Sequence, residues 1–449
     1  MKPQVFISAV TGNSGKTLFS IGLSHVLQEL GMKPQLYKCG PDFIDTQMLS
    51  VVSDNEAVNL DVWMTSPGHL QHVYNKYGEQ ADVCLIEGVG GLFDGYKRMQ
   101  GSSAEVASLL RVPVILLINA RIIGYSVAPV IYGFKNFYAG VHIAGVVFNQ
   151  VASVNHYMRL REACADVNVD CLGYIPVMEN VKMLSRHTAM SVANRNLVEE
   201  QAAMVAEQLK KTVDINRLLN KCNRNFPCQY SLPYCSDMEM DSVPVSGRRW
   251  KIAVARDSAF NFVYRENMDR LRDWGNIVFF SPLYSSELPE ADLVYLPGGY
   301  TELFARQLHR RHKMMDALRE YAEKGGRILA EGGGLLYLGR TLKMRENGTA
   351  YPMSGILPID FTIPVDSKLF VGYRKMNVDD KVWKGYEFRY STIQQDDTTN
   401  ERLDLITNLK GVGNGVTLYR YKNVIASYVH WYWGDGDILK WWEQVGPLR

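Results

Sequence analysis

A glycine-rich segment that contains a lysine and a threonine could bind the phosphates of a nucleotide. It reads TGNSGKT (Thr11–Thr17) and precedes the stretch LFSIGLSHVLQEL, whose periodicity predicts a helix. Backbone amides at a helix start bind phosphate oxygens, while the lysine reaches the β and γ oxygens and the hydroxyl can ligate Mg²⁺. The usual motif has a glycine at position 10, where this chain has Val10. We still predict a P-loop, with the nucleotide-binding residues Gly12, Asn13, Ser14, Gly15, Lys16 and Thr17.

Two acidic segments could complete a metal–nucleotide site. KCGPDFID (38–45) follows one apolar run, and IEGVGGLFDG (86–95) begins at the end of another. A carboxylate at the carboxyl end of a strand can hold Mg²⁺ beside a P-loop, and glycines let the backbone approach a ligand closely. Turn or helix-cap roles are the alternative for the aspartates. The candidate carboxylates are Asp42, Asp45, Glu87 and Asp94.

A parallel sheet with crossover helices would position these residues. Over residues 1–212, continuously apolar runs alternate with amphipathic stretches, as expected for strands that are covered on both faces. In such sheets the ligand lies at the carboxyl ends of the strands. The predicted strands are Gln4–Ala9, Pro34–Lys38, Val83–Glu87, Pro113–Ile118 and Gly145–Asn149.

A second α/β pattern begins at Trp250, and a β-rich part follows it. Because 449 residues are too many for one ordinary core, we predict an α/β protein with two domains. A P-loop domain would span 1–212 and a second α/β domain 249–449, with an aperiodic linker over 213–248. The strands predicted for the second domain are Lys251–Ala255, Ile277–Phe280, Leu293–Leu296 and Arg327–Ala330.

The composition is that of a soluble globular protein, with 47% hydrophobic and 21% charged residues. A net charge of +2 gives no reason to expect binding to nucleic acid or to a membrane surface. We recognise no secretory signal, and no apolar stretch approaches the ~20 residues of a membrane span. The seven cysteines show no regular framework, so we expect a reducing, cytoplasmic location.

Segments along nearly the whole chain, taken together, resemble cobyrinic acid a,c-diamide synthases. The first half is similar to that family's N-terminal domain, which itself resembles dethiobiotin synthetase, through YKCGPDFID, NLDVWM (59–64), IEGVGGLFDG, GSSAEVASLL (101–110), LGYIP (172–176) and LSRH (184–187). The second half resembles the family's class I glutamine-amidotransferase-like domain through IAVARDSAFNFVYREN (252–267), LPGGYTEL (296–303), GYEFRYS (385–391) and ASYVHWYW (426–433).

The resemblance implies an ATP-dependent amidoligase that uses ATP and Mg²⁺. Such enzymes phosphorylate the a and c acetate carboxylates of a corrinoid polycarboxylate, and ammonia, free or released from glutamine, attacks each acyl phosphate. Lys16 would position the phosphates and neutralise their charge. By similarity, Thr17, Asp42 and Glu87 would hold Mg²⁺, and Asp45 and Asp94 would face the corrinoid and the acyl phosphate.

The segment ILAEGGGLLYLG (328–339) has the strand–turn–helix pattern of a nucleophile elbow, but its turn carries no Ser, Cys or Thr. In the family that it resembles, this place reads Ala-Glu-Cys-Gly-Gly-Leu, and Gly332 stands where that cysteine would be. A thiolate is needed to form a glutamyl thioester. His430 matches the base that would activate it, and an ordinary histidine of an aromatic cluster is the alternative.

Three functions remain open. The chain could be a diamide synthase that uses ammonia not made by its own elbow, or a glutamine-dependent synthase that uses an unforeseen group. It could also be a P-loop ATPase switch or a corrinoid carrier without ligase chemistry. Thr11 argues against a partition-type ATPase, which has a lysine at that place. The macrocycle and a homodimer also stay open. Candidate basic contacts to a polycarboxylate are Arg186, His187, Lys368, Arg374 and Arg389.

Overall fold

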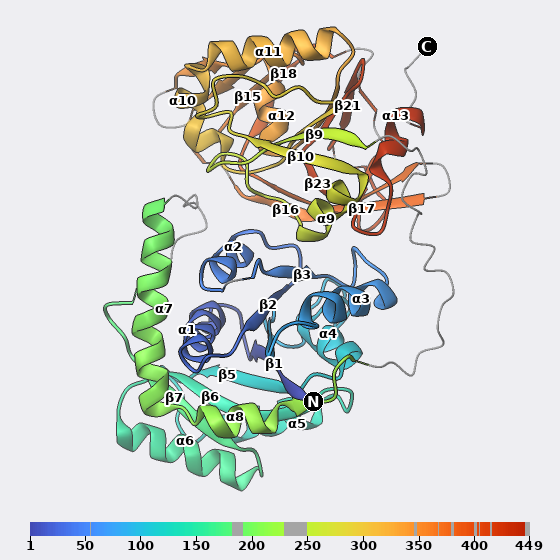
Figure 1. Cartoon of the computed structure of the whole chain (residues 1–449). Coiled ribbons are helices and arrows are strands. Elements are labelled where there is room, and N and C mark those ends of the chain that lie inside the picture. Colours follow the sequence, from blue (N-terminus) through green and yellow to red (C-terminus); the bar gives the residue numbers. More distant parts are fainter. Residues whose placement is uncertain are drawn as a thin grey trace. The chain divides into compact units, whose positions relative to one another are not determined.

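The computed structural model divides the chain into two compact units, Met1–Met238 and Glu239–Arg449, which are described separately below (Figure 1). Among the described residues, no helix combines the length and the apolar character needed to cross a membrane. The structure describes residues 1–53, 55–181, 192–228, 249–344, 348–366, 368–378, 381–398, 402–403, 405–413 and 415–444.

The first unit is built on a parallel sheet with the strand order β3-β2-β4-β1-β5-β6-β7. Strands β2 and β4 are buried at every residue, as the sequence predicts for a sheet with helices on both faces. The strands of this sheet are β1 (Lys2–Ala9), β2 (Pro34–Cys39), β3 (Val58–Leu60), β4 (Val83–Glu87), β5 (Val114–Asn119), β6 (Ile143–Val151) and β7 (Cys171–Pro176).

Helices cover both faces of this sheet (Figure 1). Alternate strand residues pack with α3, α4, α5 and α6 on one face, while α1, α2 and α7 contact one another. Serine caps begin several helices where the sequence rules place them, for example Ser66 before Pro67 and Ser102 before α4. The helices are α1 (Lys16–Glu29), α2 (Ile44–Val51), α3 (Pro67–Gly78), α4 (Ser103–Leu110), α5 (Val127–Asn136), α6 (Val154–Asp166), α7 (Val192–Thr212) and α8 (Ile215–Lys221).

The second unit contains a seven-stranded sheet with the order β10-β9-β11-β12-β22-β21-β19. All four strands predicted for this unit are present and parallel, and fully buried tryptophans such as Trp431 and Trp441 lie in its core. The sheet consists of β9 (Trp250–Ala255), β10 (Gly275–Phe280), β11 (Leu293–Leu296), β12 (Arg327–Glu331), β19 (Arg402–Leu403), β21 (Leu418–Tyr421) and β22 (Val424–Ser427).

Among the described residues of the second unit there are also two smaller four-stranded sheets and five helices. One sheet holds β13 (Thr341–Lys343), β14 (Ala350–Pro352), β15 (Ile359–Thr362) and β18 (Thr392–Asp396), and the other holds β16 (Phe370–Val378), β17 (Lys381–Arg389), β20 (Ile406–Asn408) and β23 (Val429–Tyr432). The helices are α9 (Arg265–Trp274), α10 (Ala305–His309), α11 (His312–Glu323), α12 (Gly333–Leu338) and α13 (Trp441–Gln444), with 3₁₀ turns η1 (Thr301–Phe304) and η2 (Ile438–Lys440).

The structure differs from the predicted linker, 213–248, over its first part. Residues 215–221 form α8, and β8 (Asn223–Arg224) pairs antiparallel with β1. Leu218 and Cys222, four residues apart on one side of this segment, are completely buried. The apolar residues of this segment have helical spacing and follow the cap residue Asp214, which indicates a helix. The polar composition of the segment instead suggested a linker. Residues 229–248, including Cys235, lie outside the described part of the chain.

We predict that Leu218→Ala lowers the free energy of unfolding by about 2–5 kcal/mol, because it empties a fully buried site in the first unit. Chemical denaturation measures this change. Asn220→Ala, on an exposed position of the same helix, is the matched control and should change stability by no more than about 0.5 kcal/mol. Equal, small effects of both substitutions would mean that this segment behaves as a linker.

Candidate active site

A cavity of about 680 Å³ in the first unit gathers nearly all of the predicted ligase residues. It lies where the carboxyl ends of β1, β2, β4, β5 and β6 meet, as expected for an open α/β sheet. Predicted residues in its wall are Gly12, Asn13, Ser14, Gly15, Lys16, Thr17, Asp42, Asp45 and Glu87. Polar wall residues that the sequence did not single out are Lys38, Asn119, Arg121, Asn149 and Gln150.

The glycine-rich segment forms a loop between β1 and α1, and Asn149 holds it from the end of β6. The amide nitrogen of Asn149 donates a hydrogen bond to the carbonyl oxygen of Ser14 at 2.9 Å. Gly15 has a φ of 92°, and a Cβ there would clash with the Asn149 amide. The glycine is therefore required both by its left-handed conformation and by the close approach of Asn149.

Lys16 begins α1, and its ammonium group lies in the cavity wall. Its Nζ donates to the carbonyl oxygen of Gly90 at 2.6 Å, and the residue is 7% exposed. Burial and the nearby Lys38 ammonium lower the pKa of Lys16. A buried cation that contacts a neutral carbonyl is well placed to attract the oxygens of a phosphate.

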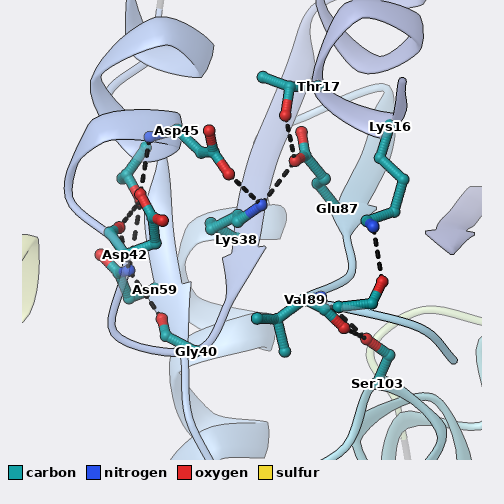
Figure 2. Close-up of polar contacts among 12 residues, drawn as sticks. Lys16, Thr17, Lys38, Gly40, Asp42, Asp45, Asn59, Glu87, Val89 and Ser103 are labelled. Carbon is teal, nitrogen blue, oxygen red and sulfur yellow. Dashed lines mark hydrogen bonds and ion pairs between the residues drawn. The ribbon is translucent and has the colours of Figure 1, made fainter. Parts of the chain in front are cut away.

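Lys38 lies at the centre of the charged groups in the cavity (Figure 2). Its ammonium contacts Oδ2 of Asp45 at 2.6 Å and Oε1 of Glu87 at 2.5 Å, and the Thr17 hydroxyl donates to the same Glu87 oxygen at 2.7 Å. Burial by itself would lower the pKa of Lys38, but the two carboxylates raise it well above its ordinary value. Lys38 is therefore a permanent buried cation.

The sequence carried one signal for Lys38, which is a lysine inside an otherwise apolar strand directly before the GPDFID segment. In the sequence, Lys38 is part of the KCGPDFID segment, and no separate role is predicted for it. Long side chains usually place their charge in water, so a lysine near a strand end does not by itself predict a buried ion pair. The partners come from α2 and β4, and only the fold brings them to β2.

Glu87 and Thr17 fit the binding of Mg²⁺. Glu87 is 1% exposed, and its Oε2 is a buried oxygen without a hydrogen-bond partner, which is the kind of atom that a cation would satisfy. Burial raises the pKa of the Glu87 carboxyl, while Lys38 and the Thr17 hydroxyl act against that rise. Among the described residues, no cluster of three or more His, Cys, Asp or Glu side chains could hold a metal. One carboxylate with phosphate oxygens is, however, a usual arrangement for Mg²⁺.

The other two predicted carboxylates also take part in turns. Asp42 lines the cavity, and its Oδ1 accepts a hydrogen bond from the Asp45 amide at 2.8 Å, which caps the start of α2. Asp94 is exposed, and its Oδ2 accepts from the amide of Gly91 at 3.0 Å. Asp94 is not among the residues that line the cavity. Gly90, at the start of the same turn, does line it.

Ser103 holds the loop that follows Glu87 (Figure 2). Its hydroxyl donates to the carbonyl oxygen of Val89 at 2.9 Å and accepts from the Val89 amide at the same distance. A Cβ at Gly88 would lie 2.6 Å from that hydroxyl oxygen, so a side chain cannot replace this glycine without moving the loop. The segment GSSAEVASLL therefore acts on the site from the start of α4.

In the second unit, the elbow geometry is present without a nucleophile. Gly332 lies between β12 and α12 with φ 48° and ψ −109°, a conformation that is strained for a residue with a side chain. The ring of His430 lies directly beside it, since a Cβ at Gly332 would be 2.6 Å from Cε1 and 2.8 Å from Nε2 of that ring. The structure thus brings together the two residues that the resemblance paired.

The surroundings of the elbow are closed. The neighbouring cavity measures about 10 Å³, roughly the room for one water molecule, and Gly332, Glu302, Arg389 and Tyr428 contribute to its wall. His430 is buried, and burial lowers its pKa to about 3, so the ring is neutral at physiological pH. The imidazole beside Gly332 is therefore uncharged, and the cavity next to it is far smaller than the cavity of the first unit.

Glu331, directly before Gly332, is a buried carboxyl. Its Oε2 accepts a hydrogen bond from the Tyr295 hydroxyl at 2.8 Å, and its Oε1 accepts from the Trp431 amide at 3.1 Å. Burial raises the pKa of Glu331 to about 8 despite these two hydrogen bonds. Glu331 therefore connects β12 to β11 and to β23 through hydrogen bonds. At neutral pH its carboxyl group is largely protonated.

The predicted basic contacts to a polycarboxylate are only partly described. Arg374 and Arg389 both form ion pairs with the buried Glu387, the latter at 2.6 Å between Nε and Oε1. Lys368 is exposed. Arg186 and His187 lie outside the described residues.

Comparisons with known proteins match this architecture along the whole chain. One family model, a CobQ/CobB/MinD/ParA nucleotide binding domain, matches residues 5–190, and a second, a CobB/CobQ-like glutamine amidotransferase domain, matches residues 251–437. These matches confirm the predicted fold class, an α/β P-loop domain followed by a glutamine-amidotransferase-like domain.

Individual relatives are similar over nearly their full lengths. The chain is 35% identical to the cobyrinate a,c-diamide synthase of Dehalococcoides mccartyi (strain CBDB1), over 97% of this chain and 96% of that protein. It is 32% identical to the protein of the same name from Saccharolobus solfataricus, over 95% and 97%. A third such protein, from Listeria innocua, is 32% identical over 95% of both chains.

We predict that Lys38→Met lowers the free energy of unfolding by about 3–5 kcal/mol, because it leaves two carboxylates near one another without their cation. Chemical denaturation at neutral pH measures the loss. Lys33→Met, at an exposed position one residue before β2, is the control and should stay within about 0.5 kcal/mol of wild type. Adding Glu87→Gln should recover part of the loss. A Lys38→Met protein as stable as the control would contradict the buried ion pair.

We predict a pH dependence of stability that comes from Glu331. Because its folded pKa of about 8 lies above the ordinary value of 4.5, the folded state binds more protons than the unfolded state between these values. Stability should therefore fall as pH rises through this window, by about 1.4 kcal/mol per pH unit from this group. Glu331→Gln, a mimic of the protonated acid, should show a flatter profile.

Chemical denaturation of wild type and Glu331→Gln between about pH 5 and pH 8 measures the difference in slope. The control is Glu290→Gln, since the side chain of Glu290 is 86% exposed and should leave the slope unchanged. Parallel profiles for wild type and Glu331→Gln would show that the carboxyl is already ionised in the folded protein.

Proposed function

The chain belongs to the cobyrinate a,c-diamide synthase family, and from this premise we propose that it amidates the a and c acetate carboxylates of cobyrinic acid, or of a close relative, in cobalamin biosynthesis. The observation that carries the proposal is that the P-loop, Lys38 and the carboxylates of Asp45 and Glu87 all line the same cavity. A phosphate-binding loop beside fixed charges of both signs suits the transfer of a phosphoryl group to a carboxylate.

The reaction requires activation of a carboxylate, which is a poor electrophile. A carboxylate oxygen attacks the γ-phosphorus of ATP, the bond between that phosphorus and the β–γ bridging oxygen breaks, and ADP leaves. Ammonia then attacks the carbonyl carbon of the acyl phosphate, the C–O bond to the phosphate breaks, and inorganic phosphate leaves after loss of a proton from nitrogen. The protein contributes mainly position and charge neutralisation to both steps.

The residues divide into two groups in this proposal. Lys16 and the P-loop amides would hold the ATP phosphates, and Thr17 and Glu87, with Asp42, would hold Mg²⁺, which supplies further charge neutralisation at the phosphates when it is bound. Asp45 and Asp94 would act on the side of the corrinoid carboxylate. Lys38 joins the groups, because its ammonium contacts both Asp45 and Glu87 and lies in the cavity wall.

We propose further that this chain does not release ammonia from glutamine at its own elbow. Four observations support this. Gly332 has no side chain to form a thioester, and the chain has no cysteine after Cys235. His430 fills the space beside Gly332, and the neighbouring cavity of about 10 Å³ is too small for a glutamine side chain. The nitrogen donor would then be free ammonia or ammonia from a partner.

The test compares two nitrogen donors. Purified protein with MgATP and cobyrinic acid should form the diamide with ammonium, and should form none with glutamine alone. Mass spectrometry of the corrinoid measures the product. Lys16→Met should lower kcat with ammonium by at least about 100-fold, because it removes a cation from the phosphate site.

The variant Gly332→Cys distinguishes two reasons for inactivity with glutamine, the lack of a thiol and the lack of space beside residue 332. We expect no gain with glutamine, because the new Cβ would lie 2.6 Å from the His430 ring. If the wild-type protein formed the diamide from glutamine as fast as it does from ammonium, the proposal about the nitrogen source would be refuted. A lack of ATP-dependent amidation with either donor would instead favour an ATPase switch or a corrinoid-binding protein.

A further inference from the structure

Asn59, in the NLDVWM segment, contacts the loop that follows β2. We infer that Asn59 is a positioning residue, which fixes the loop that carries Asp42 and Asp45 without contacting the P-loop itself. This inference rests on the proposed function for its effect on catalysis. Its effect on the loop can be measured without catalysis.

The Asn59 side chain is a donor to three acceptors of one loop, and Figure 2 labels the two residues that offer carbonyl oxygens, Gly40 and Asp42. Its Nδ2 lies 2.9 Å from the carbonyl oxygen of Gly40, 3.0 Å from that of Asp42 and 3.2 Å from Oγ1 of Thr46. Asn59 is 7% exposed, so water does not compete for these bonds. An amide NH₂ can supply two hydrogens to such a set of acceptors, and a carboxylate can supply none.

The Asn59 side chain supplies a donor at the turn where this loop leaves β2. Gly40 has a φ of 82° there, and Pro41 has no N–H to donate. The Gly40 carbonyl oxygen accepts from the Asn59 amide, and the Asp42 carbonyl oxygen accepts from both the Asn59 amide and the Thr46 hydroxyl. Asn59 lies on β3 directly opposite Lys38 of β2, which is the register that brings its amide to them.

A loop held in this way determines where Asp45 lies. The Asp42 carboxylate caps the Asp45 amide at the start of α2, and the Asp45 carboxylate reaches Lys38 at 2.6 Å. A shift of the loop by about 1 Å would break these contacts, and misplacement on that scale costs on the order of 100-fold in rate for positioned groups.

The nucleotide side has separate supports. Asn149 holds the P-loop through Ser14, and Ser103 holds the loop after Glu87 through Val89. Neither support is among the three groups to which the Asn59 amide donates. Loss of the Asn59 amide should therefore impair the activation of the carboxylate and leave the binding of Mg²⁺-free ATP by the P-loop nearly unchanged.

The main test is Asn59→Asp, which keeps the shape of the side chain and removes its donor. We expect kcat for amidation with ammonium to fall at least tenfold, while Kd for ATP measured without Mg²⁺ and without corrinoid changes less than threefold. Asn55→Asp is the matched control with the same change of charge, since the Asn55 amide only reaches the Pro34 carbonyl oxygen at 3.5 Å. It should behave as wild type.

Hydrogen exchange followed by mass spectrometry tests the loop without any need for activity. In Asn59→Asp, peptides that cover residues 40–48 should exchange at least tenfold faster than in wild type, and peptides from α1 should be unchanged. This readout decides the inference even if the wild type does not amidate cobyrinic acid, which would count against the proposed function alone.

A second pair of variants guards against misfolding of Asn59→Asp. Thr46→Val removes one acceptor of the Asn59 amide and the hydroxyl that donates to the Asp42 carbonyl at 2.5 Å, whereas Thr46→Ser keeps the hydroxyl. We expect the valine variant to lose activity and loop protection in the same pattern, and the serine variant to retain both. Equal loss of ATP binding and kcat in Asn59→Asp, or exchange at the wild-type rate over residues 40–48, would overturn the inference.

Discussion

The buried ammonium of Lys38 between Asp45 and Glu87 is the interaction on which the rest of the first unit's site depends. Each of these charges alone would be costly to bury, and together they stabilise one another only while their geometry is kept. The contact joins the ends of β2 and β4 to the start of α2, and Thr17 adds the start of α1 through Glu87. The buried ammonium of Lys38 thereby connects four elements, β2, β4, α1 and α2, around one cavity.

Around this centre, three loops of the cavity each have a neutral support. Asn149 contacts the P-loop, Ser103 the loop after β4, and Asn59 the loop after β2. All three supports come from elements other than the loops that they hold, and each bonds to main-chain atoms. This arrangement lets the charged side chains of the cavity meet a ligand while the backbone that carries them stays in place.

The second unit has the geometry of an elbow without a nucleophile on its turn. The backbone of Gly332 has a conformation that would be strained for a residue with a side chain, and His430 lies beside it. Glycine adopts that conformation without strain. The elbow is held instead by its neighbours, since Glu331 bonds to Tyr295 and to the backbone of Trp431. The backbone of this turn is therefore compatible with glycine at position 332 and is held by the residues around it.

The sequence by itself determined the P-loop, the alternation of strands and helices, the candidate carboxylates Asp42 and Glu87, and the absence of a thiol at Gly332, because each is a local pattern. It did not determine the partners of Lys38 or the roles of Asn59, Ser103 and Asn149. These depend on the strand order β3-β2-β4-β1-β5-β6, which places residues far apart in the chain at one edge of a sheet. Local patterns report what a residue can do, and only the tertiary structure decides which charges and donors it meets.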